Sequence, residues 1–100
     1  MVATSSSHNS DRDSDIGRLA AEARDGSRFA FQQLATQLEP RVFRMIYYRT
    51  RSREDAEDIC QEVFLTAFRS IRKLKQPERF ESWLFRIAVN RVKDYHRRQK

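Results

Sequence analysis

A long helical repeat of apolar residues in the middle of the chain constrains the fold most strongly. From Ser52 to Lys73 the sequence holds no glycine or proline, and apolar side chains recur three and four positions apart. Ser52 is placed to cap a helix, and Asp55 stands three positions later, where a capping box usually has Glu. We therefore predict a helix over about residues 52–73. Its apolar stripe consists of Ala56, Ile59, Cys60, Val63, Phe64, Ala67, Phe68 and Ile71.

Three other segments carry the same periodicity. A short helix is predicted from about Ser14 to Asp25, ahead of Gly26, and a long one from about Arg28 to Thr50. Pro40 lies inside the long one and predicts a kink or two abutting helices. A last helix is predicted from about Phe80 to the end of the sequence. Its inward residues are expected to be Phe80, Trp83, Leu84, Ile87, Ala88 and Tyr95.

These segments predict an all-α fold, a compact bundle of three long helices plus a short N-terminal helix. The sequence has only two glycines and two prolines, which favours long helices over tight turns. The polar segment 1–13 has almost nothing to bury, and we predict a disordered tail there, ahead of a single domain over residues 14–98.

The charge balance narrows the possible partners. The sequence has 20 Lys and Arg against 14 Asp and Glu, and the net charge of +6 favours a polyanion such as nucleic acid. The single cysteine, Cys60, excludes an internal disulfide and suits a reducing cytosol. Because the sequence has only two histidines in addition to this cysteine, we expect no metal site and no cofactor. No apolar run approaches the roughly 20 residues of a membrane span, so we expect no membrane insertion and a cytoplasmic location.

Two extended motifs occur in order along the predicted helices. Asp55–Leu65 reads DAEDICQEVFL, and Trp83–Asn90 reads WLFRIAVN, followed by DYHRR at Asp94–Arg98. Upstream, Ala30–Leu34 reads AFQQL. Together they resemble region 2 of the bacterial group IV, or extracytoplasmic-function (ECF), sigma factors of the sigma-70 family. Two long motifs at the right separation are more specific than one short pattern.

The resemblance assigns the subregions along the chain. It places region 2.1 at about residues 27–50, region 2.2 at about 52–73 and regions 2.3 and 2.4 at about 79–98. It implies a bacterial protein that docks on core RNA polymerase, recognises and melts the promoter −10 element, and is held by an anti-sigma factor. Region 4, the second domain of such factors, has no counterpart here, so we expect the sequence to be a truncated first domain.

The resemblance also implies a polymerase-binding face on the third helix. In this family, region 2.2 docks on the clamp helices of the β′ subunit. The corresponding residues here share one helical face, because they are spaced at i, i+3, i+4 and i+7. Without the resemblance the same face would fit an ordinary solvated surface. The predicted polymerase-binding residues are Asp58, Gln61, Glu62 and Leu65.

Regions 2.3 and 2.4 imply contacts with the unwound non-template strand of the −10 element. Binding a single strand needs positive charge along the backbone path and sites for unstacked bases. The resemblance places a base-capturing loop at about residues 73–82, but the glycine-free stretch 75–79 departs from many relatives, so the captured base is not carried over. Phe80 and Trp83 also fit the apolar stripe, which favours a place in the hydrophobic core. The predicted DNA-binding residues are Lys73, Lys75, Arg79, Phe80, Ser82, Trp83, Arg86, Asn90, Arg91, Lys93, Arg97 and Arg98.

Two other functions remain open at this point. A helix-turn-helix protein would place the last helix in the major groove of duplex DNA, although that motif has a turn of three or four residues between short helices. A helical adaptor or RNA-binding bundle would explain the charge but not the paired motifs. An enzyme is disfavoured, because the sequence offers no nucleophile with a base, no carboxylate pair in a plausible cleft and no glycine-rich phosphate loop.

Overall fold

The computed structural model describes residues 15–99, and all of its regular structure is helical. A leading helix covers residues 15–24. Three long helices follow, α2 (Arg28–Thr50), α3 (Arg53–Ser70) and α4 (Phe80–Gln99), with single 3₁₀ turns at Ile71–Lys73 and Pro77–Arg79 between the last two. The predicted all-α bundle of three long helices and one short helix is confirmed. The tail predicted as disordered, residues 1–13, lies outside the described residues.

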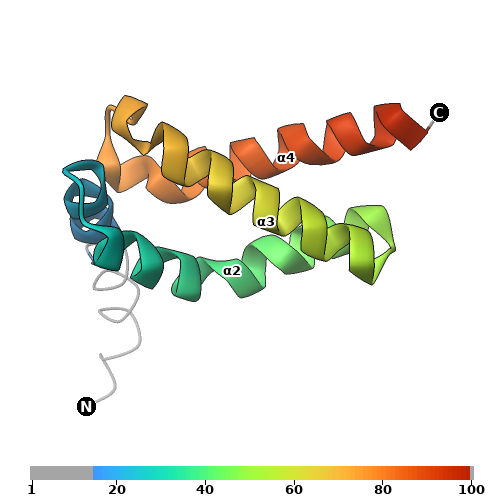
Figure 1. Cartoon of the computed structure of the whole chain (residues 1–100), viewed down its shortest axis with the longest axis horizontal. Coiled ribbons are helices and arrows are strands. Elements are labelled where there is room, and N and C mark those ends of the chain that lie inside the picture. The colour runs from blue at the N-terminus through green and yellow to red at the C-terminus, as the bar shows by residue number, and fades with distance from the viewer. Residues whose placement is uncertain (1–14, 100) are drawn as a thin grey trace, which may run out of the picture.

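The long helix α2 is continuous through its internal proline. Ser27 caps it, since its hydroxyl accepts a hydrogen bond from the Ala30 amide at 3.0 Å. Pro40 lies on the exposed side, where water can satisfy the carbonyl that loses its amide donor. The buried Leu38 and Val42 hold the helix on both sides of the proline. The prediction of two abutting helices is therefore wrong, and α2 instead bends in the middle of its length (Figure 1).

Helix α3 begins as its sequence predicts. The Ser52 hydroxyl accepts a hydrogen bond from the Asp55 amide at 3.2 Å. The Asp55 carboxylate does not complete the capping box, because it accepts a 2.7 Å hydrogen bond from the Tyr95 hydroxyl of α4. The α-helix ends at Ser70, and the last three residues of the predicted helix form a 3₁₀ turn.

One hydrophobic core joins all four helices. The predicted stripes supply most of it, and its largest fully buried side chains include Phe80, Leu34 and Leu84. Val92 is buried although it was not predicted to face inward. Phe68 was predicted as part of the buried stripe but is 42% exposed, and its ring packs edge-on against Phe31 of α2. A helix buries only the part of its apolar stripe that its neighbours reach.

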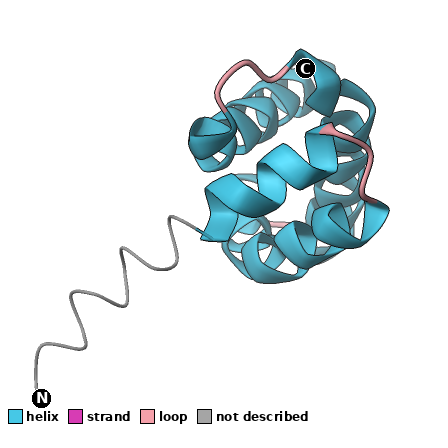
Figure 2. Cartoon of the chain, turned by 90° about the vertical axis from the view of Figure 1, so that its left-hand side faces the viewer, coloured by secondary structure: helices cyan, strands magenta, loops and turns pink. Residues whose placement is uncertain are grey.

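The leading helix lies across one end of the bundle. Figure 1 shows it, in blue, at the same end as the connection between α3 and α4. Figure 2 looks at that end and shows the helix crossing in front of the long ones. None of the helices in residues 15–99 has the length and apolar character to cross a membrane.

Candidate nucleic-acid and protein interfaces

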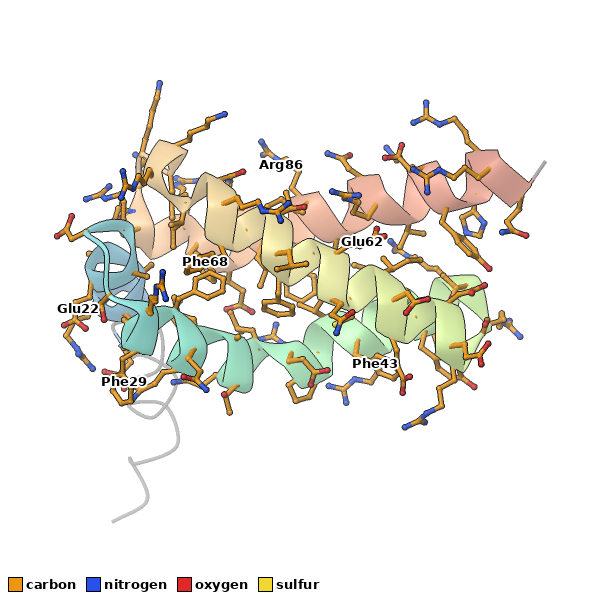
Figure 3. The ribbon with its side chains drawn as sticks, in the orientation of Figure 1. Glu22, Phe29, Phe43, Glu62, Phe68 and Arg86 are labelled. Atoms are coloured by element: carbon orange, nitrogen blue, oxygen red, sulfur yellow. The ribbon has the colours of Figure 1, made fainter. Side chains whose placement is uncertain are left out.

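The exposed side of α4 carries a row of basic and polar side chains. They are spaced three and four residues apart, so they line one side of the helix, and all are exposed. We call this the outer row: Ser82, Arg86, Asn90, Lys93 and Arg97. The opposite side holds the buried residues of the helix, Phe80, Leu84, Ala88 and Val92. Figure 3 shows Arg86 pointing away from the bundle. The outer row therefore stays free of α2 and α3 while they cover the opposite side of α4.

Three further basic residues continue the outer row at one end. Lys73, Lys75 and Arg79 are exposed on the connection, which we define as residues 71–79. The Ser82 hydroxyl donates to the Arg79 carbonyl at 3.2 Å, which joins the connection to the start of the row. From residue 80 to residue 97 the helix rises about 26 Å, the length of several nucleotides of an extended strand. The predicted DNA-binding residues on the connection and the outer row thus form one basic surface.

Phe80 and Trp83 do not extend this surface as open aromatic platforms. Phe80 has no exposed area, and its ring meets that of Phe31 edge-on, with centroids 6.3 Å apart. Trp83 is half-buried and tilts against Phe80, with centroids 5.7 Å apart. Phe80 therefore occupies the core position that the apolar periodicity favoured. In this conformation neither face of its ring is open to a base.

Arg91 is turned toward α3 rather than toward the outer row. Its guanidinium donates to the Glu62 carboxylate at 3.3 Å and to the Thr66 hydroxyl at 2.8 Å. Figure 3 shows Glu62 between α3 and α4. A residue predicted to bind DNA and one predicted to bind polymerase are thus paired with each other. A partner cation at Glu62 would compete with Arg91 for the same carboxylate.

The four predicted polymerase-binding residues share the exposed side of α3, and we call them the α3 ridge. All four are exposed, and Leu65 is 50% exposed. Gln61 and Leu65 border a groove between α2 and α3, whereas Asp58 and Glu62 border a smaller one between α3 and α4. The α2–α3 groove is mainly apolar, and its lining residues are Phe31, Ala35, Glu39, Glu57, Cys60, Gln61, Phe64, Leu65 and Phe68.

Phe64 and Phe68 are interface candidates, although their helical periodicity predicted a place in the core. Both lie on the apolar stripe of α3, yet each keeps part of its ring exposed beside Leu65. The signal in the sequence was the width of that stripe, which exceeds what one neighbouring helix covers. Together with Leu65 they give the α3 ridge an apolar border that can pack against a partner helix.

Two titratable side chains near these surfaces, Cys60 and Tyr95, have a pKa that their surroundings raise. Burial, with a smaller effect of the Glu39 charge, raises the pKa of the Cys60 thiol to about 11. The hydrogen bond to Asp55, followed by partial desolvation, raises the pKa of Tyr95. Cys60 therefore stays a neutral, buried thiol beneath the α2–α3 groove. Within residues 15–99 there is no cluster of three side chains that could hold a metal ion.

Comparison with known proteins identifies the domain. Residues 34–100 match the family model described as Sigma-70 region 2, which includes α3, α4 and both candidate surfaces. The chain belongs to this family. The region 2 domain is 40% identical over 70 residues to the ECF RNA polymerase sigma factor SigE of Mycolicibacterium smegmatis, which covers 70% of this chain and 27% of that protein.

Other relatives of this region 2 domain carry the same group name. Identity is 37% over 87 residues with the ECF RNA polymerase sigma factor SigM of Mycobacterium tuberculosis, covering 87% of this chain and 44% of that protein. It is 36% over 77 residues with the ECF RNA polymerase sigma-E factor of Haemophilus influenzae, covering 77% of this chain and 40% of that protein. The predicted resemblance to ECF region 2 is confirmed. The chain spans less than half the length of each of these relatives.

Proposed function

We propose that this region 2 domain recognises and opens the promoter −10 element as part of an RNA polymerase sigma factor. The observation that carries the proposal is the continuous basic surface formed by the connection and the outer row, on the side of α4 opposite the core. Its positive charges follow a line that suits the phosphates of one extended strand. Binding the non-template strand more tightly than the duplex favours strand separation, because only the separated state offers that strand.

The α3 ridge is the proposed docking face for the clamp helices of the β′ subunit. Asp58 and Glu62 can pair with basic residues of a partner, and Gln61 can donate and accept hydrogen bonds. Leu65, with the exposed parts of Phe64 and Phe68, can pack against apolar side chains. An anti-sigma factor that covers the α3 ridge or the outer row would block the domain.

Strand preference tests the DNA part of the proposal. We expect the parent chain to bind the single-stranded −10 non-template sequence more tightly than duplex DNA in fluorescence anisotropy. Replacing two outer-row cations, Arg86→Ala with Lys93→Ala, should weaken binding. It should also make the fall of log K with log salt less steep, by about 1–2 in slope. The matched control is Arg44→Ala with Arg49→Ala, which removes the same charge from exposed positions on α2.

Either of two outcomes would overturn the assignment. If both double variants weaken binding equally, net charge rather than the outer row drives it. If duplex DNA binds more tightly than the single strand, a duplex-reading helical protein becomes the better explanation.

Docking on polymerase needs its own test. We expect Leu65→Arg to reduce the affinity for a β′ clamp-helix fragment by about tenfold or more, because it puts a cation into the apolar border of the α3 ridge. Gln37→Arg is the matched control, since it adds the same charge at an exposed position of α2 outside the groove. Glu62 is a poorer choice, because its replacement also frees Arg91. Equal affinities of the two variants would contradict docking through this ridge.

A further inference from the structure

We infer that the leading helix positions the connection between α3 and α4, and that Arg24 is the residue through which it acts. This helix precedes the residues that match the family model, which begin at residue 34. The contact between the leading helix and the connection does not depend on the proposed function. Its consequence for DNA recognition rests on the function proposed above.

The first contact is a pair of charged hydrogen bonds to the middle of the connection. Nη1 of Arg24 donates to the carbonyl of Leu74 at 3.1 Å and to the carbonyl of Lys75 at 3.3 Å. Both carbonyls follow the 3₁₀ turn that ends α3, where backbone acceptors lack helical partners. The Leu74 side chain is buried in the core, so this residue is held both by its side chain and by its carbonyl. Arg24 thus holds the chain just after the 3₁₀ turn that follows α3.

The second contact lies near the end of the connection. A Cβ atom added to Gly17 would stand 3.5 Å from the Cα atom and 3.6 Å from the Cβ atom of Glu78, so the two backbones are neighbours. Gly17 and Arg24 are seven residues apart, two helical turns or about 10 Å along the same side of the helix. One side of the leading helix therefore meets the connection just after its first 3₁₀ turn and again within the second, at the end of the bundle seen in Figures 1 and 2.

The leading helix is itself held firmly enough to serve as a support. Its apolar face is buried in the same core as Ile71, Leu74 and Phe80, which flank the connection. The buried residues of that face are Ile16, Leu19, Ala20 and Ala23. The connection has no glycine between residues 71 and 79 and contains Pro77, so its backbone has few alternatives. Holding it at residues 74–75 and at residue 78 then fixes where Lys73, Lys75 and Arg79 stand relative to the outer row.

Hydrogen exchange on the full chain tests the contact without any DNA. We expect Arg24→Ala to speed amide exchange in residues 74–79 by about tenfold or more, with little change in α2 and α4. Arg18→Ala is the matched control, because Arg18 is an exposed arginine of the same helix that pairs within it, with Asp15 and Glu22. Equal exchange in the two variants, or faster exchange spread over the whole domain, would overturn the positioning role.

Strand discrimination tests the consequence for recognition. The measured quantity is the ratio of affinities for the −10 strand and for a scrambled strand of the same length, which a loss of charge alone leaves unchanged. We expect this ratio to fall in Arg24→Ala, to stay at the parent value in Arg18→Ala and to recover in part in Arg24→Lys, which keeps one charged donor. An unchanged ratio in Arg24→Ala would refute the effect on recognition.

A variant that keeps all charges separates position from electrostatics. Gly17→Leu extends a side chain into Glu78, whereas Gly17→Ala stops at an ordinary contact distance. We expect the leucine variant alone to speed exchange in the connection and to lower the ratio, and equal behaviour of the two variants would count against the contact. A parent chain without any strand preference would instead refute the proposed function, and the exchange data would still decide whether the leading helix holds the connection.

Discussion

Replacing Phe80 by alanine tests whether this aromatic side chain belongs to the core or to the proposed DNA-binding surface. Its ring is fully buried between the rings of Phe31 and Trp83. Removing a buried phenylalanine loses its transfer free energy and leaves a cavity, at a cost of about 3–5 kcal/mol. For a domain of this size each kcal/mol lowers Tm by about 4–8 °C. We therefore expect Phe80→Ala to lower Tm by at least about 12 °C.

Urea unfolding, monitored by circular dichroism and by tryptophan fluorescence, measures the free energy of unfolding of each variant. The sequence has one tryptophan, Trp83, whose ring centroid is 5.7 Å from that of Phe80, so its emission also reports on the cavity. Phe29→Ala is the control, because Phe29 is 70% exposed and its loss should change stability by no more than about 0.5 kcal/mol. A cost below about 1 kcal/mol for Phe80→Ala, with a clear loss of strand binding, would refute the core assignment.

Three smaller effects follow from local contacts. Ser52→Ala should cost about 1 kcal/mol by uncapping α3, and urea unfolding should show less change for Ser70→Ala, since that hydroxyl caps no helix in the described structure. The Cys60 pKa of about 11, against an ordinary 9.0, should leave the native thiol about 100-fold less thiolate than the unfolded chain at pH 8, and rapid alkylation of the native chain would contradict this. Because the hydrogen bond to Asp55 raises the pKa of Tyr95, its stabilisation should be complete below about pH 10 and fade above it. As the pH rises through this alkaline range, urea unfolding should therefore show a smaller loss of stability for Tyr95→Phe than for the parent.

Local chemistry explains why the helices could be predicted from the sequence. Ser27 and Ser52 cap helices through hydrogen bonds to amides three residues away, and such contacts depend only on neighbouring residues. The outer row follows from the same logic, because spacing alone places its five members on one side of α4. The α3 ridge was expected from the family resemblance. Spacing predicted only that its four residues share one side of α3, where all four are exposed.

Periodicity was less informative about which aromatic side chains are buried. Phe80 and Phe68 both lie on apolar stripes, yet one is fully buried and the other is 42% exposed. The difference depends on how far the neighbouring helices extend over each stripe, and helix spacing carries no information about that distance. For Pro40 the sequence left a kink and two abutting helices open, and α2 is continuous with core contacts on both sides of the proline.

The sequence by itself determined the four helices, the Ser27 and Ser52 caps and the outer row of α4, because each of these depends on residues a few positions apart. It also determined the family, because two long motifs occur in the right order along the chain. Only the tertiary structure decided that Arg91 binds Glu62 and that Arg24 holds the carbonyls of Leu74 and Lys75. These partners are 29, 50 and 51 residues apart. Such contacts form only after the core has packed the helices against one another, since that packing alone brings the distant groups within hydrogen-bonding distance.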